Sequence, residues 1–143
     1  MSVRPKLLEF EASIAVDGRL SAEDCPPLGL PTEWTAEHLL LAALLRCSLT
    51  SLRYHAKRLG VDATGRGTAR GNVTKREADG RYAFVDVEAS LVVELAPERP
   101  DDEVGELLAR AERDCFIGAS LTVTPSYTWQ VNGREVSARA APS

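Results

Sequence analysis

Apolar and polar residues alternate along residues 7–17, a pattern typical of a strand with one buried face. The apolar positions are Leu8, Phe10, Ala12, Ile14 and Val16. The dipeptide Asp17-Gly18 that follows predicts a tight turn, and residues 19–21 would begin the returning strand. Prolines recur over residues 23–34 and cannot donate to a strand ladder, so we expect a loop there.

A long apolar run over residues 36–45 predicts a helix. A helix that is apolar on every side is buried on every side. Thr32 or Thr35 could cap its start, cations ending in Arg58 suit its carboxyl end, and Gly60 would stop it. We therefore expect one buried central helix of about 24 residues, which is long for a small domain.

A hairpin is predicted for the middle of the chain. Its strands cover residues 65–76 and 82–95, with a turn at Asp79-Gly80 between them. The second strand alternates, and it would bury Val85, Val87, Ala89, Leu91, Val93 and Leu95 on one face.

A second helix and a closing pair of strands are predicted after the hairpin. Acidic residues at 101–103 open the helix and arginines close it, and its apolar stripe extends to Cys115, which would face the core. A strand over residues 119–131, a turn at Asn132-Gly133 and a short strand over residues 134–139 follow.

These elements give the order β(β)-α-β-β-α-β(β). The class is therefore α+β, with a long buried central helix and a second helix flanked by antiparallel sheets. The 143 residues correspond to a single domain over 1–143, and a composition of 44% hydrophobic and 27% charged residues is ordinary for a globular protein.

Charge and hydropathy exclude several classes of partner. The net charge of −4 argues against binding to nucleic acid. No apolar run is long enough to cross a membrane, and the N-terminus has no apolar segment of the kind found in signal peptides. We therefore expect a cytoplasmic protein with no nucleic-acid or membrane partner.

The three cysteines carry the candidate chemistry. Cys47 lies in the middle of the apolar helix and Cys115 at the end of the second helix, so both could meet in the core, whereas Cys25 lies beside two prolines in a loop. One interpretation is a pair of inert core cysteines. The other is a dithiol in which one thiolate attacks an electrophile and the second thiol resolves the product, which needs a cation nearby. The candidate cations are Arg19, Arg46 and Arg113.

No cofactor or metal is expected. The cysteines form no CxxC pair, and no Cys/His spacing matches a zinc site. His55 follows Cys47 by eight residues, and a position on the helix surface or at a subunit interface is the simpler interpretation for it. Trp34 and Trp129 are interpreted as packing or interface residues.

Two stretches resemble the OsmC/Ohr family of osmotically inducible and organic hydroperoxide resistance proteins. Residues 35–47 resemble the family's helix entry and first cysteine, with Glu37 ten residues before Cys47 as in the family pattern Pro-Glu-x-Leu-x-x-Ala-x-x-x-Cys. Residues 109–115 resemble the family's second helix, which ends in the second cysteine. The helix stop at Leu59-Gly60-Val61 and the strand over 81–95 fit the same template, so the resemblance runs from about residue 7 to residue 130.

The resemblance implies a fold, an activity and roles for particular residues. It implies an intertwined homodimer that defends against oxidative stress by reducing organic hydroperoxides. Cys47 would be the peroxidatic cysteine and Cys115 the resolving one, and Arg19, held by Glu37, would assist them. A dithiol or a lipoylated protein would be the reductant.

Two details bear on how the site is completed. In one straight helix Glu37 lies about 15 Å from Cys47 along the axis, so the site would lie at or near a subunit boundary. The chain has Phe116 and Ala36 where the family usually has proline. An alternative function therefore stays open, namely a non-catalytic dimer that binds a small apolar ligand with the cysteines as packing residues.

Overall fold

The computed structural model describes residues 5–23, 25–29 and 33–139 of the chain. Two compact units are present, one over residues 1–38 and the other over residues 39–143. The second unit contains both cysteines of the predicted pair and most of the secondary structure.

The unit 1–38 is built around a short antiparallel hairpin. Strand β1 (Ala12–Ile14) pairs with β2 (Leu20–Ala22), and Asp17-Gly18 forms the turn as predicted. The prediction that the alternating segment 7–17 buries its apolar face is wrong for this unit, since Phe10 is 80% and Ile14 71% exposed. A two-stranded hairpin has no layer of its own to cover an apolar face.

Helix α1 (Ala36–Arg58) begins and ends as the sequence predicts. Thr35 Oγ1 accepts a hydrogen bond from the His38 amide at 3.3 Å, which is an N-cap, and Thr32 lies outside the described residues. Gly60, with a φ of +72°, follows the last turn. The prediction that α1 is buried on every side is wrong for the single chain. One stripe is buried, namely Leu44, Ser48, Ser51, Leu52 and Ala56, and the opposite side is exposed.

A four-stranded sheet forms the second layer of the unit 39–143. Its strands are β3 (Asp62–Lys75), β4 (Tyr82–Ala96), β5 (Ser126–Val131) and β6 (Arg134–Val136), side by side in that order. The sheet is mixed rather than antiparallel throughout, because β5 pairs with β4 in parallel. The chain from β4 to β5 passes through helices, and such a crossover permits parallel pairing.

The crossover contains a helix that the sequence did not predict. Helix α2 (Asp101–Arg113) ends before Cys115, and a short helix α3 (Phe116–Ser120) follows it. The predicted strand over 119–131 therefore begins only at Ser126. The turn at Asn132-Gly133 is confirmed, and both residues have positive φ.

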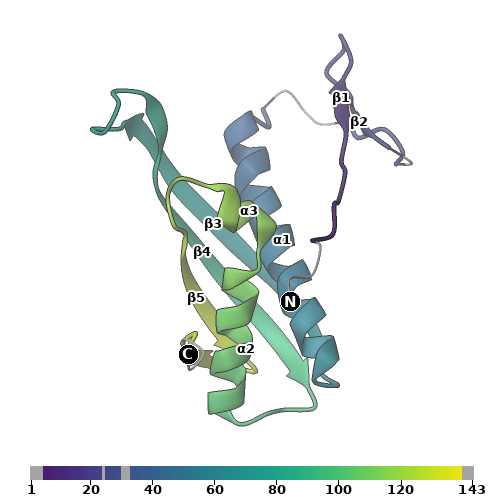
Figure 1. Cartoon of the computed structure of the whole chain (residues 1–143), viewed down its shortest axis with the longest axis vertical. Coiled ribbons are helices and arrows are strands. Elements are labelled where there is room, and N and C mark those ends of the chain that lie inside the picture. Colours follow the sequence, from purple (N-terminus) through teal and green to yellow (C-terminus); the bar gives the residue numbers. More distant parts are fainter. Residues whose placement is uncertain (1–4, 24, 30–32, 140–143) are drawn as a thin grey trace. The chain divides into compact units, whose positions relative to one another are not determined.

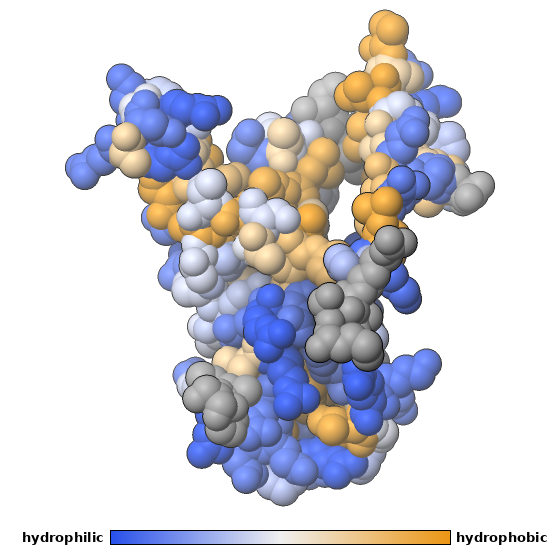
Figure 2. Space-filling model, in the orientation of Figure 1, coloured by the Kyte–Doolittle hydropathy of each residue, from blue (hydrophilic) through white to orange (hydrophobic). Residues whose placement is uncertain are grey.

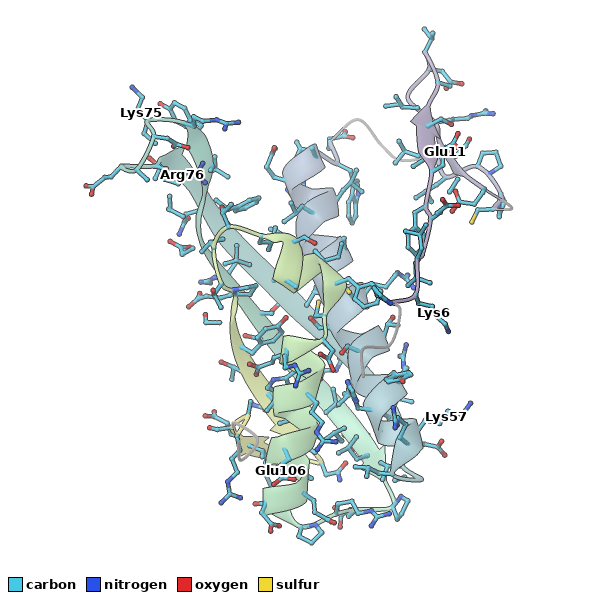
Figure 3. All side chains as sticks on the ribbon, viewed as in Figure 1. Lys6, Glu11, Lys57, Lys75, Arg76 and Glu106 are labelled. Carbon is cyan, nitrogen blue, oxygen red and sulfur yellow. The ribbon has the colours of Figure 1, made fainter. Side chains whose placement is uncertain are left out.

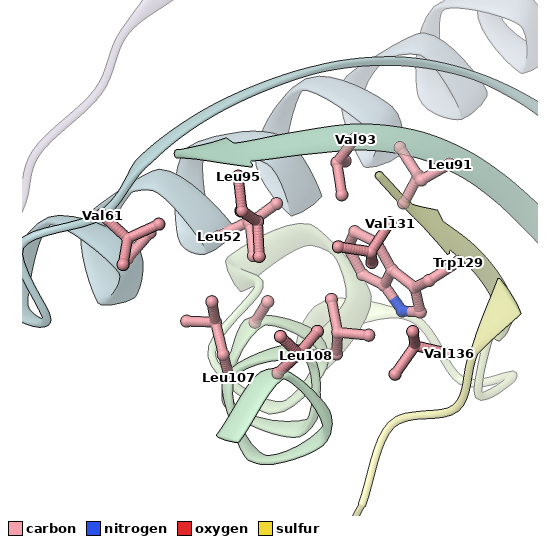
Figure 4. Packing of buried hydrophobic residues seen from close by; sticks show 13 residues of the cluster. Leu52, Val61, Leu91, Val93, Leu95, Leu107, Leu108, Trp129, Val131 and Val136 are labelled. Atoms are coloured by element: carbon pink, nitrogen blue, oxygen red, sulfur yellow. The ribbon is translucent and has the colours of Figure 1, made fainter. Parts of the chain in front are cut away.

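The core lies between the two long helices and one face of the sheet (Figures 1 and 4). The buried residues of β4 are alternate positions from Val87 to Leu95, as predicted. The predicted burial of Val85 is wrong: the residue is 37% exposed, because a register shift between Asn72 and Val73 leaves it without a partner on β3. Val87 and Ala89 belong to a smaller cluster, and Leu91, Val93 and Leu95 pack in the larger one with Leu52 of α1, Leu108 of α2 and Trp129 of β5. Because members of both helices join this cluster, α1 and α2 cover the same face of the sheet.

The outer surface carries both polar and apolar regions. At the tip of the β3–β4 hairpin, Arg76 pairs with Asp79 at 2.6 Å and donates to Thr122 at 3.1 Å (Figure 3). Apolar side chains are exposed in the unit 1–38, and Figure 2 shows further hydrophobic surface on the larger unit. Within the described ranges, no helix is both long and apolar enough to span a membrane.

Candidate active site

Cys47 presents its thiol from α1 toward α3. The side chain is partly buried, and its sulfur accepts a hydrogen bond from the backbone amide of Ile117 at 3.5 Å. It packs against a small apolar cluster whose buried members are Leu44, Val87, Ala89 and Cys115. Leu41, Phe84, Ile117 and Val123 are partly buried against the same cluster. The thiol therefore lies in an apolar environment.

Cys115 lies between α2 and α3 and is fully buried. The sequence placed it at the end of the second helix, whereas it is the N-cap of α3, and its sulfur accepts from the amide of Gly118 at 3.4 Å. A thiol can act as an N-cap because the first amides of a helix have no hydrogen-bond acceptor within the helix. The predicted core-facing position of Cys115 is confirmed.

The structure brings the two thiols together. Both are free, both belong to the same apolar cluster, and the neighbouring Cys115 thiol raises the pKa of Cys47. Adjacent amides, those of Ile117 and Gly118, donate to the two sulfurs. Two neighbouring thiols can be joined by a two-electron oxidation, so the arrangement suits dithiol–disulfide chemistry.

Two hydroxyl groups beside Cys115 were missed by the sequence analysis. Ser48 Oγ lies 3.7 Å from Cys115 Sγ and 2.9 Å from the hydroxyl of Tyr127, and it donates to the carbonyl oxygen of Leu44 at 2.8 Å. Ser48 is fully buried. A serine one turn after Leu44 on the buried stripe of an apolar helix was a signal that something polar faces it.

Burial raises the pKa of the Cys47 thiol above its ordinary value. The neighbouring Cys115 thiol raises the pKa further, while the amides of Ile117 and Phe116 lower it without reversing the direction. Within the described part of the chain, no cation contributes to this pKa. A peroxide-reactive thiolate needs such a charge, so residues 39–139 do not by themselves activate Cys47.

The candidate cations belong to the other unit, are exposed, or have carboxylate partners. Arg19 belongs to the unit 1–38, where its Nε lies 3.5 Å from Asp17 Oδ2, and Glu37 lies in the same unit in the first turn of α1. Arg46 is exposed on α1, and the Nε of Arg113 lies 3.3 Å from Asp114 Oδ1. Only the two cysteines of the four predicted site residues are thus brought together within one unit.

The remaining candidates fall outside the thiol cluster. His55 Nε2 lies 2.8 Å from Oδ2 of Asp114, the residue before Cys115. Cys25 is exposed in the unit 1–38. Trp129 is buried in the core, as the packing interpretation predicts. Among the described residues, no three His, Cys, Asp or Glu side chains are grouped so that they could hold a metal ion.

Comparison of the sequence with known families identifies the class to which this fold and thiol pair belong. The sequence model described as "OsmC-like protein" matches residues 29–130. The chain belongs to the OsmC-like family. No curated protein sequence matches the chain.

Solved structures of the family share this fold at low sequence identity. An OsmC-like protein of unknown function from Vibrio cholerae superposes with a TM-score of 0.73 at 14% identity, covering 86% of this chain and 99% of that chain. The organic hydroperoxide resistance protein OhrB of Bacillus subtilis gives 0.53 at 16% identity, with 87% and 96% covered. An organic hydroperoxide resistance protein from Elizabethkingia anophelis gives 0.58 at 16% identity, with 90% and 98% covered. Some neighbours in the family are thus named for hydroperoxide resistance and others have no assigned function.

Proposed function

We propose that this protein is a cysteine-based peroxidase that reduces organic hydroperoxides to alcohols in defence against oxidative stress. Cys47 is the peroxidatic cysteine and Cys115 the resolving cysteine. The observation that carries the proposal is that these two free thiols share one apolar cluster and accept hydrogen bonds from the amides of adjacent residues, Ile117 and Gly118. Membership of a family that includes organic hydroperoxide resistance proteins supports it.

The proposed cycle has three balanced steps. The Cys47 thiolate attacks the terminal oxygen of ROOH, the O–O bond breaks, and the alkoxide takes a proton to leave as ROH, so that Cys47 becomes a sulfenic acid. The Cys115 thiol then attacks that sulfur, and its proton leaves with the hydroxide as water, which forms the disulfide. An external dithiol or a lipoylated protein returns two electrons and two protons and restores both thiols.

The apolar residues beside Cys47 indicate which class of hydroperoxide is the proposed substrate. Leu41, Phe84 and Ile117 line the cluster beside the thiol of Cys47, and they favour the alkyl or aryl group of an organic hydroperoxide over hydrogen peroxide. Such groups gain free energy when they leave water for an apolar surface.

Arg19 and Glu37 complete the proposed site. An arginine beside Cys47 would counter the effect of burial, stabilise the thiolate and receive the charge that develops on the leaving oxygen. We assign this part to Arg19 and its orientation to Glu37, within a homodimer that covers the exposed apolar face of the unit 1–38. A reducing cytoplasm, where free thiols persist, is the compartment that fits this cycle.

A single-turnover oxidation tests the proposal. The reduced protein is mixed with a slight excess of cumene hydroperoxide, and free thiols, intact mass and cumyl alcohol are measured. We expect loss of two thiols, a disulfide mapped to Cys47 and Cys115, and one alcohol per disulfide. Cys47→Ser should abolish alcohol formation, Cys115→Ser should stop after one turnover at a sulfenic acid that dimedone traps, and Cys25→Ser should behave as the wild type.

One observation favours the second candidate function. Burial raises the pKa of Cys47, which is the behaviour of a packing residue rather than of a nucleophile. If both thiols stay free and no alcohol forms, the peroxidase proposal is wrong. A non-catalytic dimer that holds a small apolar ligand at the cluster would then be the function to test, by displacement of a hydrophobic fluorophore.

A further inference from the structure

The sulfur of Cys115 has an unusually polar setting for a fully buried thiol. It accepts from the amide of Gly118 at 3.4 Å and lies 3.7 Å from Ser48 Oγ. The hydroxyl of Tyr127 lies 2.9 Å from Ser48 Oγ, and a Cβ placed on Gly118 would lie 3.6 Å from both the Tyr127 hydroxyl oxygen and the Cys115 sulfur. A packing cysteine needs none of these groups, because a neutral thiol is a weak hydrogen-bonding partner.

The hydroxyl hydrogens can be assigned from the distances. Ser48 has one hydrogen and three acceptors in reach, the carbonyl oxygen of Leu44 at 2.8 Å, the hydroxyl oxygen of Tyr127 at 2.9 Å and Cys115 Sγ at 3.7 Å. We assign the hydrogen to the shortest contact, the carbonyl oxygen, while Cys115 is a neutral thiol, so that Tyr127 is the donor in its bond to Ser48 Oγ. When Cys115 carries a charge, rotation of the Ser48 hydroxyl brings its hydrogen to the sulfur, and the amide of Ser48 still satisfies the Leu44 carbonyl within the helix.

We propose that Ser48 and Tyr127 are positioning residues for the reductive half of the cycle, in which they stabilise Cys115 as the thiolate that leaves the disulfide. The inference rests on the proposed function for the Cys47–Cys115 disulfide. It adds which of the two sulfurs leaves when the disulfide is reduced, and which groups stabilise that sulfur.

Exposure determines which sulfur the reductant reaches. Cys47 is partly exposed, whereas Cys115 is fully buried. A dithiol can therefore attack only the sulfur of Cys47, and its own sulfur joins Cys47 in a mixed disulfide. The bond to Cys115 breaks, and its electron pair goes to Cys115 Sγ, which becomes a thiolate. The second thiol of the reductant then displaces Cys47 and leaves as a cyclic disulfide, and its proton and that of the first thiol restore the two protein thiols.

The leaving sulfur is where hydrogen-bond donors have their effect. Thiol–disulfide exchange is faster when the departing thiolate is stabilised. Gly118 supplies one donor from the backbone, and Ser48 with Tyr127 supplies the rest from side chains. A hydrogen bond to a charged group is worth about a factor of ten or more, so loss of one hydroxyl should slow the opening of the disulfide by about tenfold.

The experiment measures reduction without requiring peroxidase activity. The disulfide is formed with diamide, a two-electron thiol oxidant, and its reduction by dithiothreitol is followed by stopped flow in Ser48→Ala and Tyr127→Phe. Ser51→Ala is the control for Ser48, because Ser51 is also a buried serine of α1 whose hydroxyl has no partner among the described residues. Tyr54→Phe is the control for Tyr127, because Tyr54 is exposed.

A second measurement, the oxidation of Cys47 by cumene hydroperoxide, separates a positioning role from a general structural effect. We expect both variants to be reduced about tenfold more slowly, both controls at the wild-type rate, and the second-order rate constant for oxidation of Cys47 by cumene hydroperoxide to be unchanged. Wild-type reduction rates in both variants, or equal slowing in the controls, would overturn the inference. So would equal slowing of the oxidation step, since that would mean displacement of the whole cluster.

The two proposals fail in different ways. If peroxide leaves the thiols free but diamide forms the disulfide and the variants slow its reduction, the peroxidase proposal fails and this inference stands. If diamide forms no Cys47–Cys115 disulfide, this inference fails, while a trapped sulfenic acid on Cys47 would still support the attack on peroxide.

Discussion

The backbone amide of Ile117 donates a hydrogen bond to the sulfur of Cys47 across 3.5 Å. With the amide of Phe116 it lowers the pKa of that thiol, and burial outweighs both. Neutral amides do not supply the charge that a peroxide-reactive thiolate needs. No cation among the described residues of the unit 39–143 contributes to the pKa of Cys47, and Arg19 is the proposed source of that charge.

Replacement of this arginine should therefore affect both reactivity and ionisation. In Arg19→Ala we expect the rate constant for cumene hydroperoxide to fall by about a hundredfold, as when one donor to a developing oxyanion is removed. Labelling of Cys47 by iodoacetamide should need a more alkaline pH than in the wild type, because the cation that favours the thiolate is gone. Stopped-flow kinetics and mass spectrometry of the labelled peptide check these outcomes.

Arg70→Ala is the matched control for Arg19. Arg70 is an exposed arginine of β3 whose Nε lies 3.8 Å from Glu88 Oε2, remote from any role in the proposed cycle. It should leave the rate and the labelling curve unchanged. A wild-type rate in Arg19→Ala would show that another group ionises Cys47.

Glu112 makes stability depend on pH. Burial raises the pKa of Glu112, and the hydrogen bond that Trp129 Nε1 donates to it at 2.9 Å offsets this only in part. For an acid whose pKa is raised by folding, the folded state is most favoured below the ordinary pKa, and that advantage is lost as the pH rises through the raised pKa. Glu112→Gln keeps an acceptor for Trp129 and removes the charge.

We therefore expect Glu112→Gln to raise the free energy of unfolding at neutral pH and to have little effect in acid. Urea unfolding at both pH values measures this. Glu94→Gln, at an exposed position of β4, should change little at either pH. A variant less stable than the wild type at neutral pH would contradict the expectation and show that the ionised carboxylate is the better partner for Trp129.

Gly67 of β3 marks a tight contact with its neighbouring strand β4. A Cβ there would lie 2.6 Å from the carbonyl oxygen of Ser90 and 2.8 Å from Leu91 Cδ2. Gly67→Ala should lower the free energy of unfolding by about 1–3 kcal/mol, the usual cost of an overpacked core. Gly29→Ala is the control, since a Cβ at Gly29 meets nothing within 4 Å. Thermal unfolding of both variants measures the effect, and equal melting temperatures for Gly67→Ala and Gly29→Ala would contradict the prediction.

The exposed apolar face of the unit 1–38 predicts self-association. Phe10 is 80% and Ile14 71% exposed, which is costly for a monomer in water. We expect the wild type to sediment as a dimer, and Phe10→Asp to shift it toward the monomer because burial of the new carboxylate is unfavourable. Ser13→Asp, which adds the same charge at the alternate position of β1, should remain dimeric. A monomeric wild type at micromolar concentration would contradict the proposed homodimer.

Local signals in the sequence predicted most of the elements. The N-cap at Thr35, the stop at Gly60 and the buried alternate positions of β4 from Val87 to Leu95 each depend on residues close together in the chain, and each is confirmed. Features set by distant residues were not predictable in this way. The parallel pairing of β5 with β4 depends on the crossover, and α3 depends on a thiol that caps it.

The candidate site shows the same contrast between features set by nearby residues and features set by distant ones. Periodicity placed Cys47 and Cys115 on the core side of their helices, but only the fold puts one beside the other. Ser48 and Tyr127 lie 79 positions apart in the chain, and no motif joins them. The exposed apolar residues at 8–16 alternate as a buried strand would, because the pattern reports that a face is to be covered and not what covers it.

The long separations within the thiol cluster have a consequence for biosynthesis. The hydrogen bonds from Ile117 to Cys47 and between Ser48 and Tyr127 join residues 70 and 79 positions apart. Contacts of this kind form late, because a long loop must be closed before they return any free energy. While the chain is still on the ribosome, Cys47 has neither Cys115 nor Tyr127 beside it. The nascent protein therefore carries an isolated Cys47 thiol, and the two thiols become neighbours only once Cys115 has been synthesised and the long segment between them has folded.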